Sequence, residues 1–223
     1  MKPYYEQDGI TIYHGDCRDV MSCVSADVVV SDPPYGMKWP CDNRRFCGGS
    51  PDSKARRPKQ PRFYPSVVGD DEPFDPAPWL LFTRTILWGA NHFSQALPRG
   101  TTLVWIKRLE GAFGTFLSDA EIAWMSGGHG VYCFRDLSMQ GETHWRQHPT
   151  QKPIPLMQWC LGFTSGTVLD PFMGSGSTLL AAKELGRCAI GIEIEERYCE
   201  IAANRLRQGV LTGMFLTPSE AEA

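Results

Sequence analysis

The apolar positions of this chain fall into two patterns, which predict strands and helices. Short continuous runs rich in β-branched residues, bounded by glycine, proline or aspartate, predict strands that are buried on both faces. These strand segments are 10–14, 27–31, 85–88, 102–106, 167–170 and 188–193, with weaker candidates at 120–124 and 131–134. Apolar residues at helical spacing predict helices at 18–24, 79–82, 154–163, 177–185 and 195–208.

The last third of the chain has the most regular order, because strands and helices alternate there from about residue 154 onwards. Such alternation is typical of parallel strands joined by helices that cover both faces of a sheet. The helix at 177–185 also ends at Gly186, a residue that suits a helix C-terminus. We therefore expect an α/β fold with a doubly wound, Rossmann-like sheet that is mostly parallel.

One long segment interrupts this order. The strand at 27–31 stops at Pro33 and Pro34, which cannot donate hydrogen bonds to a neighbouring strand. The following residues, 37–73, are rich in Pro, Gly, Arg and Lys and have little periodicity, so they form a long insertion. We expect a single domain over residues 1–216 that includes this insertion, and a flexible tail over residues 217–223.

The charge of the chain is unevenly distributed. Its 223 residues are 42% apolar, which suffices for a packed core, and the net charge of −3 with a pI near 6.0 disfavours a simple basic nucleic-acid binder. However, residues 37–62 contain eight basic and two acidic side chains. This stretch carries +6, which leaves −9 for the rest of the chain. The average therefore hides a basic segment directly after the prolines.

The sequence predicts neither a membrane protein nor a metalloprotein. It has no run of about 18 apolar residues, and its first residues lack the apolar core of a signal peptide, so we expect a cytoplasmic protein. Eight cysteines are scattered without a CxxC pair, as suits free thiols in a reducing compartment. The spacing of Cys41 and Cys47 is not diagnostic of a metal site.

A glycine-containing turn joins the strand at 167–170 to the helix at 177–185. Glycines allow a ligand to approach the backbone, and the start of a helix offers free N–H groups. Glu193 ends the next strand, 23 residues after Asp170, where an acidic side chain can accept two hydrogen bonds from a ribose diol. A third glycine is missing from the dinucleotide pattern, so a nucleoside without a pyrophosphate fits better than NAD. A purely structural turn is the alternative.

The second chemical feature is the turn Asp32-Pro33-Pro34-Tyr35, which follows a buried strand. Ligands of open α/β sheets bind at such strand ends. The prolines fix the Asp32 carboxylate and the Pro33 carbonyl, and two fixed acceptors can hold both hydrogens of an exocyclic amine. Tyr35 can offer a flat face for stacking against a base. An isolated tetrapeptide of this kind is equally often a stiffened loop.

Together these motifs resemble those of the beta-class S-adenosylmethionine-dependent DNA amino-methyltransferases. The Asp32 turn comes before the segment 172–176, which is the beta-class order, and the segment 148–153 (HPTQKP) is also typical of the family. The resemblance covers roughly residues 10–30, the Asp32 turn and residues 148–205. It implies a methyltransferase sheet and S-adenosylmethionine as the cofactor.

The resemblance also implies roles for individual residues. Asp32 corresponds to the catalytic carboxylate, Pro33 and Pro34 to the rigid turn, and Tyr35 to the stacking platform. Besides Asp32, the expected cofactor-binding residues are Asp16, Cys17, Thr150, Gln151, Lys152, Asp170, Phe172, Gly174, Ser175, Gly176, Ser177, Thr178 and Glu193. Within this set, Asp16 is expected at the adenine, Lys152 and its neighbours at the carboxylate end, and Asp170 near the methionine amino group. A helix N-cap is the alternative role for Asp16.

The basic segment is predicted to contact DNA. It directly follows the turn at Asp32, and it mixes cationic with aromatic side chains. The residues expected at DNA are Lys38, Trp39, Arg44, Arg45, Arg56, Arg57, Lys59 and Arg62. A solvated insertion without a ligand is the alternative, since charge runs are usually solvated.

The resemblance thus implies transfer of a methyl group from S-adenosylmethionine to the N6 amine of a flipped adenine in double-stranded DNA. Aspartate at position 32 favours adenine, whereas serine there would favour cytosine. Cytosine N4 is the first alternative, RNA is the second, and a catalytically silent DNA-binding protein of the same fold is the third. The compact chain leaves little room for a recognition domain, so we expect a homodimer, within a restriction–modification system or as an orphan enzyme.

Overall fold

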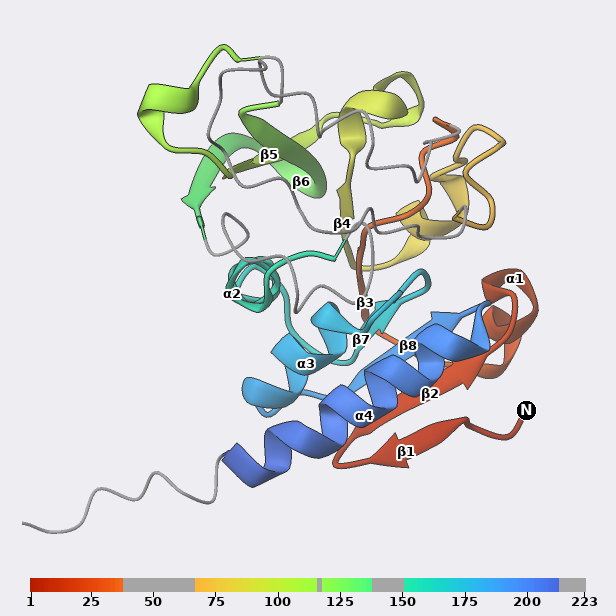
Figure 1. Ribbon diagram of the computed structural model, residues 1–223. Coiled ribbons are helices and arrows are strands. Elements are labelled where there is room, and N and C mark those ends of the chain that lie inside the picture. Colours follow the sequence, from red (N-terminus) through yellow and green to blue (C-terminus); the bar gives the residue numbers. More distant parts are fainter. Residues whose placement is uncertain (38–66, 116–117, 138–150, 213–223) are drawn as a thin grey trace, which may run out of the picture.

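The computed structural model describes residues 1–37, 67–115, 118–137 and 151–212, and one eight-stranded sheet runs through this part of the chain (Figure 1). The strands lie in the order β1-β2-β8-β7-β3-β4-β6-β5, from the bottom to the top of the view. Their bounds are β1 Tyr5–Gln7, β2 Ile10–His14, β3 Val28–Ser31, β4 Arg84–Trp88, β5 Gly100–Ile106, β6 Ala120–Arg135, β7 Val168–Asp170 and β8 Ala189–Glu193.

The centre of the sheet is parallel, as the sequence predicts. β2, β8, β7, β3 and β4 pair in parallel with their neighbours, and β1 joins β2 in the antiparallel sense. Each of these five strands therefore ends at the same edge of the sheet. Because loops at the carboxyl ends of parallel strands commonly form ligand sites, this edge is where the candidate residues are expected to meet.

Both faces of the sheet are covered, which explains the continuous apolar runs. Along β3, Val28 and Val30 pack into one core cluster, whereas Val29 between them packs into the other. The first cluster takes in α2 (Ile154–Leu161), α3 (Ser177–Glu184) and α4 (Glu196–Thr212). The second takes in α1 (Cys17–Val20) and the 3₁₀ segments on the opposite face. This arrangement confirms the predicted doubly wound, Rossmann-like architecture.

One predicted helix is wrong in type. The apolar residues at 79–82 belong to a 3₁₀ helix, Ala77–Leu81, rather than to an α-helix. Pro76 and Pro78 bracket its first residue, and proline removes the N–H donors that further turns of α-helix need. The helix predicted at 18–24 is likewise shorter, because α1 ends at Val20 and continues as a 3₁₀ turn, Met21–Cys23.

The edge of the sheet formed by β6 and β5 departs from the alternation of parallel strands and helices. Residues 120–126 of β6 run antiparallel to β5, whereas residues 131–135 of the same strand run parallel to it. Thr102 of β5 accordingly pairs with both Trp124 and Val131. The two weak strand candidates are thus two arms of one long bent strand, which folds around β5 through a glycine-rich segment at 127–130.

The sequence interpretation missed β1. The strand pairs with β2 across a two-residue turn at Asp8 and Gly9, both of which have positive φ (53° and 77°). Asp-Gly is a typical pair for the type I′ hairpin turn, so a signal for this hairpin was present in the sequence. Within the described ranges, no helix has both the length and the apolar composition that a bilayer span requires.

Candidate functional site

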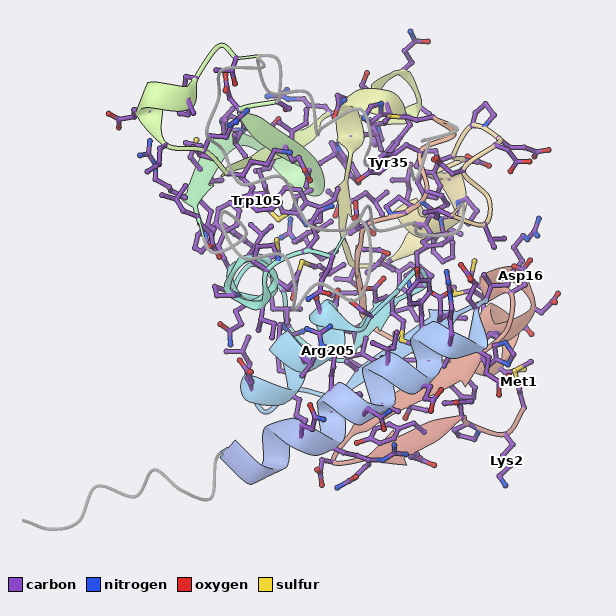
Figure 2. The ribbon with its side chains drawn as sticks, viewed as in Figure 1. Met1, Lys2, Asp16, Tyr35, Trp105 and Arg205 are labelled. Atoms are coloured by element: carbon purple, nitrogen blue, oxygen red, sulfur yellow. The ribbon has the colours of Figure 1, made fainter. Side chains whose placement is uncertain are left out.

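Four acidic residues from the sequence motifs lie at the carboxyl edge of the parallel strands. Asp32 directly follows β3, Asp170 ends β7, Glu193 ends β8 and Asp16 lies two residues beyond β2. The strand order puts β2 beside β8, β8 beside β7 and β7 beside β3, so the four positions form a row. The Asp16 and Tyr35 side chains mark this edge in Figure 2. The topology therefore brings together motifs that are more than 150 residues apart in the sequence.

Asp32 and Tyr35 form the centre of this site. The Tyr35 hydroxyl donates a hydrogen bond to Oδ1 of Asp32, and the Lys152 ammonium pairs with Oδ2. The Asp32 side chain is 15% exposed, so it is accessible from the edge of the sheet while most of it is enclosed. The site thus has a carboxylate whose orientation is fixed on both oxygens.

Asp70 holds the turn in place, and the sequence analysis did not identify it. Its Oδ1 accepts backbone N–H groups from Tyr35, Gly36 and Met37 at 3.2, 3.0 and 3.1 Å. Next to this contact, a Cβ at Gly36 would lie 2.4 Å from the Glu72 carbonyl oxygen, so the two backbones are in close contact. Residues on both sides of the segment 38–66 are therefore fastened to the turn that carries Asp32.

The Tyr35 ring is packed between β4 and a neighbouring imidazole. The His92 ring stacks on it with a centroid distance of 4.8 Å and an interplanar angle of 13°. Gly89 has a φ of 72°, and a Cβ there would lie 2.0 Å from Cε1 of Tyr35. Only glycine leaves room for the ring at this point. Gly89 and His92 thus set the plane of the tyrosine.

Lys152 pairs with two carboxylates of the protein. Its Nζ pairs with Asp32 and lies 3.2 Å from Oε2 of Glu121, and its expected contact at the cofactor carboxylate stays a prediction. Glu121 in turn binds Nζ of Lys107 at 2.6 Å through Oε1. The sequence could not indicate this arrangement, because Lys107 and Glu121 reach the site only through the pairing of β4 with β6 and of β6 with β5. The side chain of the neighbouring Gln151 is buried.

The charges in this group shift one another's pKa values. Burial raises the pKa of Asp32 and the nearby charge of Glu121 adds to this, while Lys152 lowers it without reversing the rise. Burial disfavours a charged Lys152, but the carboxylates of Asp32 and Glu121 outweigh it and hold the lysine pKa well above its usual range. For Glu121, burial is likewise outweighed by Lys152 and Lys107, which lower its pKa to about 2. Lys152 and Glu121 are therefore both charged at neutral pH.

Asp170 is buried and fully engaged inside the protein. Ser31 Oγ donates to its Oδ1 at 2.5 Å, Thr178 Oγ1 donates to its Oδ2, and the Phe172 N–H donates at 3.2 Å. Burial raises the pKa of Asp170 to about 6 despite these hydrogen bonds, and the charge of Asp32 contributes. Thr178 is 2% exposed and contacts this carboxylate, and its expected place at the cofactor stays a prediction. The predicted contact of Asp170 with a cofactor amino group stays a prediction.

Glu193 lies across the glycine turn from Asp170. Its Oε2 accepts the Gly174 N–H at 3.0 Å, and its Oε1 accepts the Glu195 N–H at 2.8 Å. Burial raises the pKa of Glu193 to about 6, in spite of these two donors. Each carboxylate oxygen can accept a further hydrogen bond, so the geometry leaves Glu193 able to bind a diol.

The rest of the glycine turn is built for close packing. A Cβ at Gly176 would lie 2.8 Å from the Ala202 Cβ of α4, so the start of α3 lies tightly against α4. Arg205, labelled in Figure 2, donates to the Ser175 carbonyl oxygen and lies 3.2 Å from its hydroxyl. The Ser177 hydroxyl, in the first residue of α3, is buried and has no hydrogen-bond partner among the described residues. It is a donor available to a ligand.

Phe172 belongs to an aromatic cluster beside this turn. Its ring meets Phe74 and Trp79 edge to face, with centroid distances of 5.8 and 5.5 Å. The cluster packs the chain that follows the segment 38–66 against the β7 end, so it connects the turn after β7 to the region beside Tyr35.

Asp16 forms the helix N-cap that the sequence analysis gave as its alternative role. As the N-cap of α1, it accepts the Arg18 backbone N–H at 2.9 Å and also binds the Arg18 side chain. The hydrogen bonds with Arg18 lower the pKa of Asp16. Cys17 is half-buried, and burial raises its pKa to about 11, so its thiol is protonated. Contact of either residue with an adenine remains a prediction.

Several predicted site residues lie outside the described residues. These are Thr150 and the whole expected DNA-contacting set: Lys38, Trp39, Arg44, Arg45, Arg56, Arg57, Lys59 and Arg62. Cys41 and Cys47 also lie outside them. In the part of the chain that the structure describes, no group of three or more His, Cys, Asp or Glu side chains is arranged to bind a metal ion.

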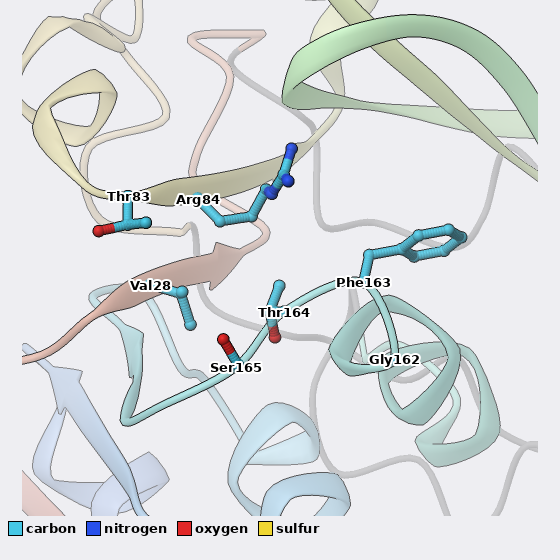
Figure 3. Close-up of a pocket in the computed structure, with 7 residues that line it drawn as sticks. All are labelled: Val28, Thr83, Arg84, Gly162, Phe163, Thr164 and Ser165. Carbon is cyan, nitrogen blue, oxygen red and sulfur yellow. The ribbon is translucent and has the colours of Figure 1, made fainter.

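An open pocket lies at the opposite edge of the sheet. It is lined by Val28, Thr83 and Arg84 at the starts of β3 and β4, and by residues 162–165 after α2 (Figure 3). Since Asp32 follows the other end of β3, this pocket is separated from the candidate site by the length of the strand. Its one cationic side chain, Arg84, donates to the Ser126 carbonyl oxygen.

Comparisons with known proteins show similarity to DNA methyltransferases. A family model described as DNA methylase matches residues 101–204. The type II methyltransferase M.ScaI of Streptomyces caespitosus is 26% identical over 92% of this chain and 84% of its own length. Other curated relatives are 40% to 50% identical, but these matches span only 18% to 30% of the relatives' own lengths.

Solved structures share the fold. The M1.HpyAVI–SAM complex is 20% identical with a TM-score of 0.53, and the match covers 88% of this chain and 98% of that one. The PvuII DNA methyltransferase, described as cytosine-N4-specific, is 13% identical with a TM-score of 0.57 and covers 99% of this chain and 91% of its own. At these identities the similarity concerns the architecture, which is that of DNA methyltransferases.

Proposed function

Because this chain belongs to the S-adenosylmethionine-dependent DNA amino-methyltransferases, we propose that it methylates the N6 amine of an adenine flipped out of double-stranded DNA. The observation that carries the proposal is the Asp32–Tyr35 pair at the carboxyl edge of the sheet. It combines a fixed carboxylate with an aromatic ring, beside a glycine turn that is built for a ligand.

The glycine turn fits the cofactor. Two features suit a nucleoside with hydroxyl groups. The buried Ser177 hydroxyl has no partner among the described residues, and Glu193, which accepts the Gly174 N–H, can accept further hydrogen bonds. When bound, S-adenosylmethionine would supply a methyl group that is carried on a sulfonium sulfur. The amine nitrogen attacks the methyl carbon, and the sulfur keeps the electron pair of the broken C–S bond. Glu193 would hold the ribose and Ser177 a polar group near the start of α3.

The role of Asp32 is to make the amine a better nucleophile. An exocyclic amine on an aromatic base is a poor nucleophile because its lone pair is delocalised into the ring. When Asp32 and the Pro33 carbonyl accept its two N–H groups, the lone pair is localised on nitrogen. The proton that the methylated nitrogen then loses passes to Asp32 and on to water. Tyr35 is the proposed stacking partner of the flipped base, which would take the place of the His92 ring.

The adenine assignment rests on the acceptor at position 32. A carboxylate suits the N6 amine, and the same pair of acceptors can also hold the N4 amine of cytosine. Cytosine N4 is therefore the second candidate. A second observation favours this candidate, because the PvuII enzyme, with which this chain shares its fold, is described as cytosine-N4-specific. A silent DNA-binding protein is disfavoured because Asp32 and Tyr35, the residues that the proposed chemistry needs, lie together at the carboxyl edge of the sheet.

Double-stranded DNA is the proposed partner of the basic segment. Asp70 and Gly36 fasten the residues flanking this segment beside the turn that carries Asp32, so both ends of the segment start from the site. The proposed setting is the cytoplasm, and the proposed assembly is a homodimer that grips a symmetric site.

Nucleoside analysis tests the proposed reaction. Purified chain is incubated with isotopically labelled S-adenosylmethionine and plasmid DNA, and the DNA is digested and examined by mass spectrometry. We expect labelled N6-methyladenine from the wild type and none from Asp32→Ala, whose cofactor affinity by calorimetry stays close to that of the wild type. Labelled N4-methylcytosine would replace the adenine assignment, and full activity of Asp32→Ala would overturn the site.

A further inference from the structure

Both carboxylate oxygens of Asp32 already have a partner. The Tyr35 hydroxyl donates to Oδ1, and the Lys152 ammonium pairs with Oδ2. Under the proposed function, this carboxylate also has to accept an N–H from the target amine. A hydrogen bond between an ammonium and a carboxylate is strong because both groups are charged. It draws electron density from the carboxylate, which then polarises a second donor less. Each oxygen can still accept one further hydrogen bond, but the ammonium weakens it, so methyl transfer favours an arrangement in which Lys152 has left Asp32.

A second carboxylate lies within reach of the Lys152 ammonium. Oε2 of Glu121 is 3.2 Å from Nζ of Lys152, and Oε1 of Glu121 is 2.6 Å from Nζ of Lys107. Positive and negative groups therefore alternate in the order Lys107, Glu121, Lys152 and Asp32. The Lys152 side chain is 7% exposed, so its charge is largely removed from water.

The sheet fixes the two ends of this row. Lys107 follows β5 and Glu121 is near the start of β6, while Asp32 follows β3. The pairing of β3 with β4, of β4 with β6 and of β6 with β5 holds these three positions at one edge. Lys152 comes from the segment before α2, and its long side chain reaches between the two carboxylates. It is thus the member that can change partner without backbone movement.

We propose that Glu121 is a positioning residue for methyl transfer, which receives the Lys152 ammonium when the target amine takes its place at Asp32. The inference rests on the proposed function. The exchange keeps the buried ammonium paired throughout, which avoids the high cost of an uncompensated buried charge. The movement is short because Nζ of Lys152 already lies beside both carboxylates.

The ionisation states support an exchange of ion pairs without proton transfer. Burial opposes the charge of Lys152, but Asp32 and Glu121 hold its pKa well above the usual range. Burial is similarly outweighed at Glu121, whose pKa is about 2. Burial keeps the other nearby groups neutral, raising the pKa of Tyr35 well above its usual value and that of the Cys160 thiol to about 12. Near neutral pH, only the partner of Lys152 changes.

A double-mutant cycle tests whether Glu121 acts through Lys152. Glu121→Gln, Lys152→Met and the double variant are compared in single-turnover methylation of DNA with saturating S-adenosylmethionine. We expect Glu121→Gln to lower the rate about tenfold or more, because the ammonium stays on Asp32. Cofactor affinity by calorimetry should stay the same. In the Lys152→Met background, Glu121→Gln should cause no further loss, since there is no ammonium left to receive.

Lys152→Met has a second expected signature. Without the ammonium, burial and Glu121 raise the pKa of Asp32, so activity should fall at neutral pH and recover as the pH rises. Glu110→Gln is the matched control, because Glu110 also pairs with a cation but is 79% exposed and has no contact with Lys152 among the described residues. Its rate should equal that of the wild type.

Two results would overturn the inference. One is an unchanged rate in Glu121→Gln, and the other is an equal fold-loss from this substitution in both backgrounds, as a purely structural role predicts. If the wild type methylates no DNA, the proposed function fails instead. The electrostatic contact on which the inference rests is then tested separately, by the ¹³C titration of the Asp32 carboxyl in the free chain. There, Glu121→Gln should lower the pKa of Asp32, and an unchanged pKa would refute the contact.

Discussion

The Ser31 hydroxyl donates a hydrogen bond to Oδ1 of Asp170 at 2.5 Å, and so ties the last residue of β3 to the last residue of β7. Both side chains are buried. The turn that carries Asp32 begins at the next residue, and the glycine turn begins directly after Asp170. This hydrogen bond therefore fixes the distance between the proposed amine acceptor and the proposed cofactor bed.

Ser31→Ala should destabilise the protein. The substitution leaves a buried carboxylate oxygen with one donor fewer, and such losses cost about 1–3 kcal/mol. The unfolding free energy from urea denaturation measures the effect. Ser22→Ala is the control, because its exposed hydroxyl contacts only the nearby Asp19 carbonyl oxygen and Cys23 Sγ among the described residues. If both variants are equally stable, the Ser31–Asp170 hydrogen bond contributes nothing.

Asp70→Ala should lower the methylation rate without loss of cofactor binding. Asp70 holds three consecutive N–H groups of the turn after Pro34, and a turn released from this anchor no longer fixes Tyr35. A misplaced group of this kind can cost on the order of a hundredfold in rate. The adjacent Asp71→Ala is the control, since Asp71 is exposed. Equal rates for the two variants would contradict the role of Asp70.

Gly89→Ala should impair activity far more than Gly114→Ala. Both glycines have a φ near +70°, so alanine is strained at either position by about 1 kcal/mol. Only at Gly89 would the new Cβ collide with the Tyr35 ring, whereas nothing lies within 4 Å at Gly114. Steady-state methylation rates and melting temperatures separate the two effects. Similar activity of both variants would show that the plane of Tyr35 is unimportant.

The stability of the protein should depend on the protonation of Glu193. Burial raises its pKa from 4.5 to about 6, so the folded state binds a proton more tightly than the unfolded state. The stabilisation is complete below pH 4.5 and is lost as the pH rises through 6. Relative to Glu193→Gln, the wild type should lose about 2 kcal/mol across this range. A constant difference in unfolding free energy would refute the shift.

The four-fold variant of Arg44, Arg45, Arg56 and Arg57 to Ala should weaken DNA binding and reduce its dependence on salt. Each lost phosphate contact lowers the slope of log affinity against log salt concentration by about 0.9. S-adenosylmethionine affinity should stay the same. Unchanged DNA affinity across a salt series would show that the basic segment is a solvated insertion.

The sequence predicted the parallel sheet because its strands are continuous apolar runs, whose burial on both faces leaves few alternatives. It also brought Asp32, Asp170 and Glu193 to one edge, since parallel strands end together. Apolar spacing predicted an α-helix where the structure has the 3₁₀ helix Ala77–Leu81. Two prolines there remove N–H donors that an α-helix would need. The partners of Lys152 could not be predicted, because Glu121 meets it only through the pairing of β6 with β4.

The role of Asp32 in methyl transfer to DNA is tested by modified-base sequencing of plasmid DNA from cells that express the wild-type chain or Asp32→Ala. We expect N6-methyladenine at one short recurring sequence in the wild-type sample and its complete absence from the Asp32→Ala sample. Unmodified DNA from both samples, or the same methylation in both, would contradict the claim that Asp32 carries out methyl transfer to DNA.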